Sequence, residues 1–121
     1  MSEPVETAWH GKWIAVKTRG KWEYVSRTRG SQAVVVVAID EDDHVLLIDQ
    51  YRVPLGKRCI ELPAGLVGDD LADDTPEKAA VRELEEETGY TAERIELLGE
   101  FHSSPGLVTE GFTLTLSLIH I

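Results

Sequence analysis

The sequence is poor in cysteine, in basic residues and in long apolar runs. Cys59 is its one cysteine, so no disulfide can form within the chain. Twelve lysines and arginines face 22 aspartates and glutamates, for a formal net charge of −10. That balance argues against nucleic-acid binding, because a phosphate backbone requires a basic face. The longest apolar run, residues 33–39, is far shorter than the roughly 18 residues that suggest a membrane span.

The start of the chain lacks the features of a secretory signal. Its first six residues, Met-Ser-Glu-Pro-Val-Glu, have neither the basic nor the apolar region of a secretory signal. The sequence therefore predicts a cytoplasmic protein that binds neither membranes nor nucleic acids. With 121 residues, 42% of them hydrophobic, the chain can build one core and is too short for two.

Apolar periodicity and turn residues predict a mixed α+β domain. Strands are expected at 13–17 and 22–26, which form a hairpin, and at 33–39 and 45–49, which form a second hairpin. Further strands are expected at 58–62, at 95–101 and from 112 onward. The β-branched run 33–39 is typical of a strand covered on both faces. Pro63-Ala64-Gly65 is expected to close the strand at 58–62, and residues 66–75 and 103–111 to form loops.

One helix carries both a start and a stop signal. Thr75 suits the N-cap, Pro76 suits the first helical position, and Gly89 supplies the residue that commonly ends a helix. A helix over 76–88 is therefore predicted. Its expected packing side consists of Ala80, Val81, Leu84 and Thr88.

An adjoining sector of this helix carries Glu83, Glu86 and Glu87. Like charges at this spacing repel by roughly a few tenths of a kcal/mol per exposed pair, so the cluster does not serve helix stability. Oxygen ligands of this kind suit hard cations such as Mg²⁺ or Mn²⁺. The alternative is a solvated acidic face without a metal.

The segment from Arg82 to Gly89 resembles the second half of the motif that defines the Nudix hydrolases: Arg-Glu, an aliphatic residue, any residue, Glu-Glu, any residue, Gly. The Glu61-Leu62-Pro63-Ala64-Gly65 segment strengthens the resemblance. The first half departs from the motif. Asp74 stands where the motif has glutamate, and the loop counted from Gly65 carries three extra residues.

The resemblance implies a Nudix fold and a set of catalytic residues. Glu83 and Glu87 would ligate the metals, with Glu86 as the third carboxylate and the carbonyl oxygen of Ala64 as a backbone ligand. Arg82 would pair with carboxylates of the motif and orient them. The implied reaction is attack of a metal-activated water on a pyrophosphate.

Other segments resemble the ADP-ribose pyrophosphatase branch of this family. The segment from Trp22 to Arg27 is similar to a motif whose tryptophan stacks on adenine across a dimer interface, which implies a homodimer. Arg52 in Gln50-Tyr51-Arg52 would meet the diphosphate. The implied substrate-binding residues are Trp22, Glu23, Arg27, Arg52, Gly106, Leu107 and Glu110.

Several aromatic, histidine and cysteine side chains also have plain structural interpretations. Trp22 could be a packing residue, and Trp9 and Trp13 are expected to be structural. Cys59 is expected to be a buried small hydrophobe. His44 and His102 lack partners at the spacing of a zinc site.

The resemblance covers residues 13–114, with 1–30 expected to be the N-terminal strands that dimerise and 31–121 the Nudix domain. The family's further C-terminal strands, its helix and a loop glutamate are expected to be missing. The last six residues, Leu-Ser-Leu-Ile-His-Ile, match a peptide encoded by a sequencing adapter. An artefactual end is therefore expected, and a genuine short variant is the alternative.

The expected function is Mg²⁺-dependent hydrolysis of ADP-ribose to AMP and ribose 5-phosphate, with reduced or no activity in a shortened chain. Two alternatives stay open. The substrate could be another nucleotide sugar such as GDP-mannose, or the domain could bind a nucleotide without turning it over.

Overall fold

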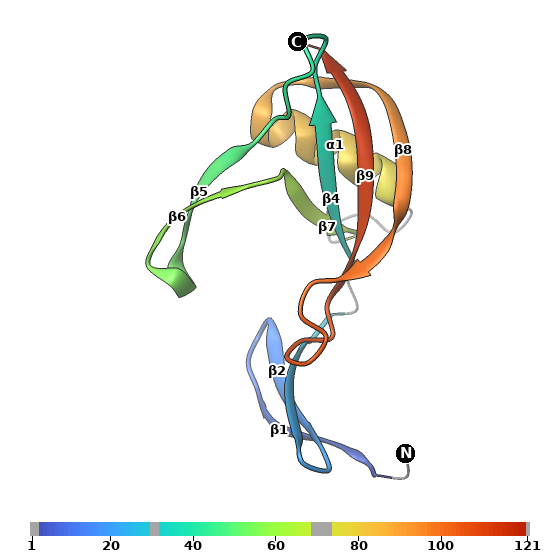
Figure 1. Cartoon of the computed structure of the whole chain (residues 1–121). Helices are drawn as coiled ribbons and strands as arrows, with labels where there is room; N and C mark the ends of the chain where they lie inside the picture. The colour runs from blue at the N-terminus through green and yellow to red at the C-terminus, as the bar shows by residue number, and fades with distance from the viewer. Residues whose placement is uncertain (1–2, 30–31, 69–73, 121) are drawn as a thin grey trace.

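A computed structural model describes residues 3–29, 32–68 and 74–120 (Figure 1). At the N-terminus, β1 (Val5–His10), β2 (Ile14–Arg19) and β3 (Trp22–Arg27) form an antiparallel sheet in that order. The predicted hairpin is confirmed as β2 and β3. Strand β1 was missed. All six of its residues are exposed, so no buried face marks it in the sequence.

The central sheet has the order β7, β4, β9, β8 and is mixed, as predicted. Strand β4 (Gln32–Ile39) runs parallel to β9 (Gly111–His120), while β7 (Ala64–Val67) and β8 (Thr91–His102) pair antiparallel with their neighbours. The expectation that Pro63 to Gly65 only closes a strand is wrong, because β7 begins at Ala64. Pro63 prepares this pairing by accepting a 2.8 Å hydrogen bond from the Val36 N–H.

A hairpin of β5 (Ile48–Arg52) and β6 (Lys57–Glu61) projects from the central sheet (Figure 1). A short 3-10 helix over Val53–Leu55 joins its strands. The predicted pairing of 33–39 with 45–49 is largely wrong. The turn does form, with the Leu46 N–H donating to the Ala38 carbonyl at 2.9 Å, but the chain then leaves β4 and pairs with β6 instead.

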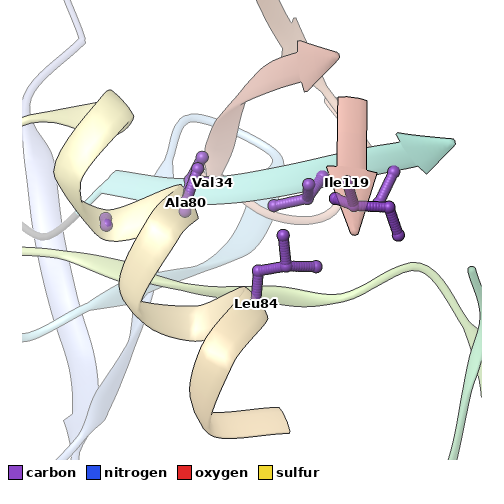
Figure 2. Packing of buried hydrophobic residues seen from close by; sticks show 7 residues of the cluster. Val34, Ala80, Leu84 and Ile119 are labelled. Carbon is purple, nitrogen blue, oxygen red and sulfur yellow. The ribbon is translucent and has the colours of Figure 1, made fainter. Parts of the chain in front are cut away.

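Helix α1 spans Pro76–Thr88, the predicted range. The Thr75 hydroxyl accepts from the Lys78 N–H at 3.2 Å, and Gly89 ends the helix at φ 78°. Ala79, Ala80 and Leu84 are buried against β4 and β9, where Figure 2 shows Leu84 near Ile119. The predicted packing side is wrong in one residue: it included Val81, which is partly exposed, and left out Ala79, which is fully buried. No helix in the described ranges is long and apolar enough to cross a membrane.

Strand β9 presents its polar side chains to the helix. Thr113, Thr115 and Ser117 alternate with larger apolar residues, and they pair in register with the buried face of β4. Small side chains here let α1 lie close to the sheet. Leu114 and Leu116 consequently face the opposite side of the sheet, where they are half-buried. In β4 itself, Val34, Val36 and Ala38 are buried and Val35 and Val37 are half-buried, so the predicted cover on both faces is complete on one face and partial on the other.

Candidate functional site

Glu83 and Glu87 lie one turn apart on the side of α1 that faces β7. Packing of Ala80 and Leu84 fixes the rotation of the helix, and this rotation turns both carboxylates toward the strand. The two carboxylates lie close enough to shift each other's pKa, and the backbone of Ala64 lies close enough to lower the pKa of Glu87. The site is therefore built from the helix and the first residues of β7.

The two carboxylates resist carrying charge together. Burial, followed by the nearby charge of Glu83, raises the pKa of Glu87 to about 7. Burial and then the charge of Glu86 also raise the pKa of Glu83. One oxygen of Glu87, Oε2, is buried and has no hydrogen-bond partner among the described residues. A bound cation would relieve all of these costs at once.

Arg82 ties the helix to the segment that precedes it. Its Nη2 donates to Asp74 Oδ2 at 2.9 Å and to the Leu66 carbonyl at 3.3 Å. The Asp74 side chain is 1% exposed and also accepts from the Gly68 N–H at 2.9 Å. These hydrogen bonds, with that of Arg82 first, lower the pKa of Asp74 to about 2. Asp74 is thus a carboxylate of the motif segment with which Arg82 pairs.

Arg52 reaches the same region from the β5–β6 hairpin. Its guanidinium is close enough to lower the pKa of Glu87, although burial raises that pKa by more. A cavity of about 370 Å³ lies between Glu87 and residues of β5 that include Ile48 and Gln50. Arg52 itself is bonded twice to Glu61. The positive charge of Arg52 thus acts on Glu87, while its guanidinium is bonded to a different carboxylate.

Glu86 differs from the other two helix glutamates, because its side chain is exposed. A separate group of potential metal ligands lies outside the helix. In the part of the chain that the structure describes, the donor atoms of Asp40, Asp42 and His44 lie within 4.8 Å of one another. Their arrangement has a structural cause. Asp40 Oδ1 accepts from the backbone N–H groups of Asp42 and His44, both at 2.9 Å, and so closes the turn after β4.

A second group of candidate residues lies around β3. Trp22, with 63% of its surface exposed, lines a pocket of about 450 Å³ together with Gly106. The loop that carries Gly106 is bonded to β3 like an added strand. Val25 donates from its N–H to the Leu107 carbonyl at 2.8 Å and accepts from the Thr109 N–H at 2.9 Å.

Arg27 and Glu110 form an ion pair in an adjoining pocket of about 310 Å³. Glu23 and Leu107 are exposed and line neither pocket. Glu83 and Glu87 line neither pocket as well. Within one chain the predicted residues thus form two groups: the carboxylates near Arg52, and the aromatic and polar residues around β3.

Two residues with a clear place in the site escaped sequence reasoning. Glu61 was quoted only as part of a motif, and no local pattern shows that Arg52 is its partner. No contact with the helix was predicted for Gly65, although it lies directly against Glu83. Its position in the motif could have suggested a close approach between two segments.

Comparison with known proteins decides the family. The NUDIX domain matches residues 30–114, well over half of the chain. The chain belongs to the NUDIX family. It is 36% identical over 128 residues to mouse ADP-sugar pyrophosphatase, and this alignment covers 88% of this chain and 57% of that protein. It is 40% identical over 78 residues to ADP-ribose pyrophosphatase from Bacillus subtilis, and that alignment covers 64% of this chain and 40% of that protein.

A crystal structure of an ADP compounds hydrolase superposes with a TM-score of 0.78 and 23% identity, over 97% of this chain and 66% of that one. This match confirms the predicted NUDIX fold, an α+β architecture with a mixed sheet and, in the described residues, one α-helix. The chain spans 58% and 56% of the length of two relatives from Schizosaccharomyces pombe and Caenorhabditis elegans.

NUDIX proteins generally use a divalent cation, and the residues present fit one. Glu83 and Glu87 offer oxygen ligands, as Mg²⁺ and Mn²⁺ require, and one Glu87 oxygen is buried and unpartnered among the described residues. The raised pKa of Glu87 is what a carboxylate pair shows without its cation.

Proposed function

We propose that the protein is a pyrophosphohydrolase that splits ADP-ribose into AMP and ribose 5-phosphate. The observation that carries this proposal is the partly buried pair Glu83 and Glu87, which lies against β7 in a NUDIX domain and is influenced by the charge of Arg52. ADP-ribose is favoured as the substrate because relatives named ADP-ribose pyrophosphatase and ADP-sugar pyrophosphatase match this segment.

The proposed cofactor is Mg²⁺, or Mn²⁺, held by Glu83, Glu87 and the Ala64 carbonyl oxygen, with Glu86 as the third carboxylate. When bound, the cation supplies charge neutralisation to both phosphates and lowers the pKa of the attacking water. Arg52 binds an oxygen of the diphosphate through charge-assisted hydrogen bonds. Arg82 keeps the helix in position by its bond to Asp74.

Residues around β3 are proposed to hold the rest of the nucleotide sugar. Trp22 offers an exposed ring on which adenine can stack. Glu23 and Arg27 follow it on the same strand, while the loop with Gly106, Leu107 and Glu110 lies beside the terminal ribose. The two pockets around β3 are not lined by Glu83 or Glu87, and we propose a homodimer. Residues 1–30 of one chain would complete the site formed by residues 31–121 of the other.

A panel of nucleotide sugars tests the proposal. With Mg²⁺, the protein is expected to release AMP from ADP-ribose, and chelation of the metal should stop the release. Faster release of GMP from GDP-mannose would replace the proposed substrate. Calorimetric binding of ADP-ribose without AMP release, at any Mg²⁺ concentration, would show a nucleotide-binding module instead of an enzyme.

A further inference from the structure

The arginine proposed to meet the diphosphate already has a carboxylate partner. Arg52 donates from Nε to Glu61 Oε2 at 2.7 Å and from Nη2 to Glu61 Oε1 at 2.6 Å. Such a bidentate pair fixes the orientation of the guanidinium as well as its position. The Arg52 side chain is 47% exposed and that of Glu61 27%. A pair at this exposure adds little stability, so its main consequence is geometric.

The pair runs lengthwise along one face of the β5–β6 hairpin. Arg52 lies opposite Lys57 at the tip of the hairpin, and Glu61 lies opposite Ile48 at its base. Since alternate residues share a face, Lys57, Cys59 and Glu61 lie on the same side. The Arg52 side chain must therefore extend past Cys59, from the tip toward the base, to reach Glu61. Glu61 thereby directs the guanidinium toward the strand β7 and the helix.

The donors that remain on Arg52 form a second edge. A guanidinium has five N–H donors, of which Glu61 takes that of Nε and one of the two on Nη2. Nη1 keeps both of its donors, since it makes no hydrogen bond within the described part of the chain. One N–H of Nη1 and the second N–H of Nη2 point in parallel, which matches two oxygens of one phosphate.

We propose that Glu61 is a positioning residue for Arg52. It binds the guanidinium edge formed by Nε and Nη2, so that the edge formed by Nη1 and Nη2 faces one phosphate of a diphosphate. The inference relies on the proposed function for the substrate class and adds a role for Glu61. In this arrangement each oxygen of the Glu61 carboxylate accepts one hydrogen bond from Arg52, so the proposed role of Glu61 is to orient Arg52.

Two other roles for the pair make different predictions. If Glu61 were a latch that competes with phosphate for Arg52, removing its charge would tighten diphosphate binding. If the pair only joined the two strands of the hairpin, any ion pair of that hairpin would matter equally. The chain offers a matched control for the second case. On the opposite face, Arg58 donates from Nε to the Asp49 carboxylate at 3.1 Å and from Nη2 to the Asp49 carbonyl at 2.8 Å.

The test is calorimetric titration of the full chain with inorganic pyrophosphate at a fixed Mg²⁺ concentration. Arg52→Ala should raise the Kd about tenfold or more, as expected for the loss of a charge-assisted phosphate contact. Glu61→Gln should raise it about fivefold to tenfold by releasing the guanidinium. Glu61→Asp, which keeps the charge on a shorter side chain, should give a smaller increase. Arg58→Gln should stay within about twofold of wild type.

An unchanged Kd in Glu61→Gln, a tighter one, or an equal loss in Arg58→Gln would each overturn the role of Glu61. Circular dichroism and thermal melts establish that the variants fold. Pyrophosphate binding is read without turnover of ADP-ribose. If wild type fails to release AMP but the Kd values for pyrophosphate still rank the variants as expected, the proposed function fails and the positioning role of Glu61 stands. Where AMP is released, Glu61→Gln should raise KM more than it lowers kcat.

Discussion

Gly65 lies directly against the carboxylate of Glu83. A β-carbon built on Gly65 would be 2.1 Å from Cδ and 2.3 Å from Cγ of Glu83, far inside contact distance. Gly65 is not among the glycines with a positive φ, so space, and not backbone conformation, requires a glycine at this position. Without a side chain here, β7 lies close enough to α1 for the Ala64 backbone to lower the pKa of Glu87.

Gly65→Ala is therefore expected to displace Glu83 and to weaken metal binding. The methyl group must move either the carboxylate or β7, and both disturb the two ligands together. We expect Mn²⁺ affinity, measured by electron paramagnetic resonance, to fall about tenfold or more, in line with losses seen when ligand orientation is disturbed. Gly106→Ala is the control, because a β-carbon at Gly106 would meet nothing within 4 Å. Equal Mn²⁺ affinity in Gly65→Ala and wild type would refute this account of the close approach.

Asp74→Asn should destabilise the protein. The Asp74 side chain is almost fully buried and receives a charge-assisted bond from Arg82, and losing such a bond costs about 1.5–3 kcal/mol. Glu96→Gln, which breaks the exposed pair with Arg94, should change the unfolding free energy by less than about 1 kcal/mol. Urea unfolding measures both variants. Equal changes in the two would mean that Asp74 does not anchor the helix.

The same pair predicts a pH dependence. The pKa of Asp74 is about 2 in the folded protein, below its usual value of 3.8. The folded state therefore binds fewer protons between these values, and the stabilisation is complete above about pH 4 and lost as the pH falls toward 2. The difference in unfolding free energy between wild type and Asp74→Asn should shrink over this range. A difference that stays constant from pH 6 to pH 2 would contradict the assigned pKa.

Local signals were sufficient to predict the helix and not the pairing of the strands. Thr75, Pro76 and Gly89 are neighbours of the residues that they cap, so the helix was placed correctly from Pro76 to Thr88. Strand β7 was missed because Pro63 and Gly65 both interrupt regular structure. Its partner, β4, lies some thirty residues earlier in the chain, and no local pattern specifies such a pairing.

The candidate site likewise has a part that the sequence predicts and a part that depends on the packed structure. The carboxylates Glu83 and Glu87 follow from the motif, because both lie on one helix at fixed spacing. The pairing of Arg52 with Glu61 depends on the register of β5 against β6 and on the direction of a long side chain. Neither can be deduced from spacing alone. The contact of Gly65 with Glu83 depends on a distance between two elements, which only the packed structure fixes.

Glu87→Gln should lower AMP release by orders of magnitude and leave the fold intact, because the variant keeps the shape of the side chain and loses a charged ligand. Without metal, the variant should also be the more stable protein above pH 7. The pKa of Glu87 is raised from 4.5 to about 7, so the folded wild type binds more protons in that range and loses stability as the pH rises through it.

Thermal melts in chelator at pH 5 and pH 8 measure this effect. The two proteins should differ little at pH 5, and Glu87→Gln should have the higher Tm at pH 8. Adding Mg²⁺ at pH 8 should raise the Tm of wild type more than that of the variant, since ligands that bind the folded state stabilise it. The metal assignment would be contradicted if Glu87→Gln released AMP at the wild-type rate, or if the variant had the lower Tm at pH 8.

Trp22→Ala tests whether the group around β3 binds the base. The ring of Trp22 is largely exposed on the wall of the pocket that it shares with Gly106, so its removal should cost little folding stability. Losing a stacking surface for adenine should cost roughly 1–3 kcal/mol of binding, which would raise the KM for ADP-ribose and leave the Kd for inorganic pyrophosphate unchanged. Trp9→Ala is the control, because Trp9 is similarly exposed on β1 and lines neither of the two pockets around β3. If Trp22→Ala leaves the KM unchanged, or if Trp9→Ala raises it as much, Trp22 is a packing residue of the N-terminal sheet and the base is held elsewhere.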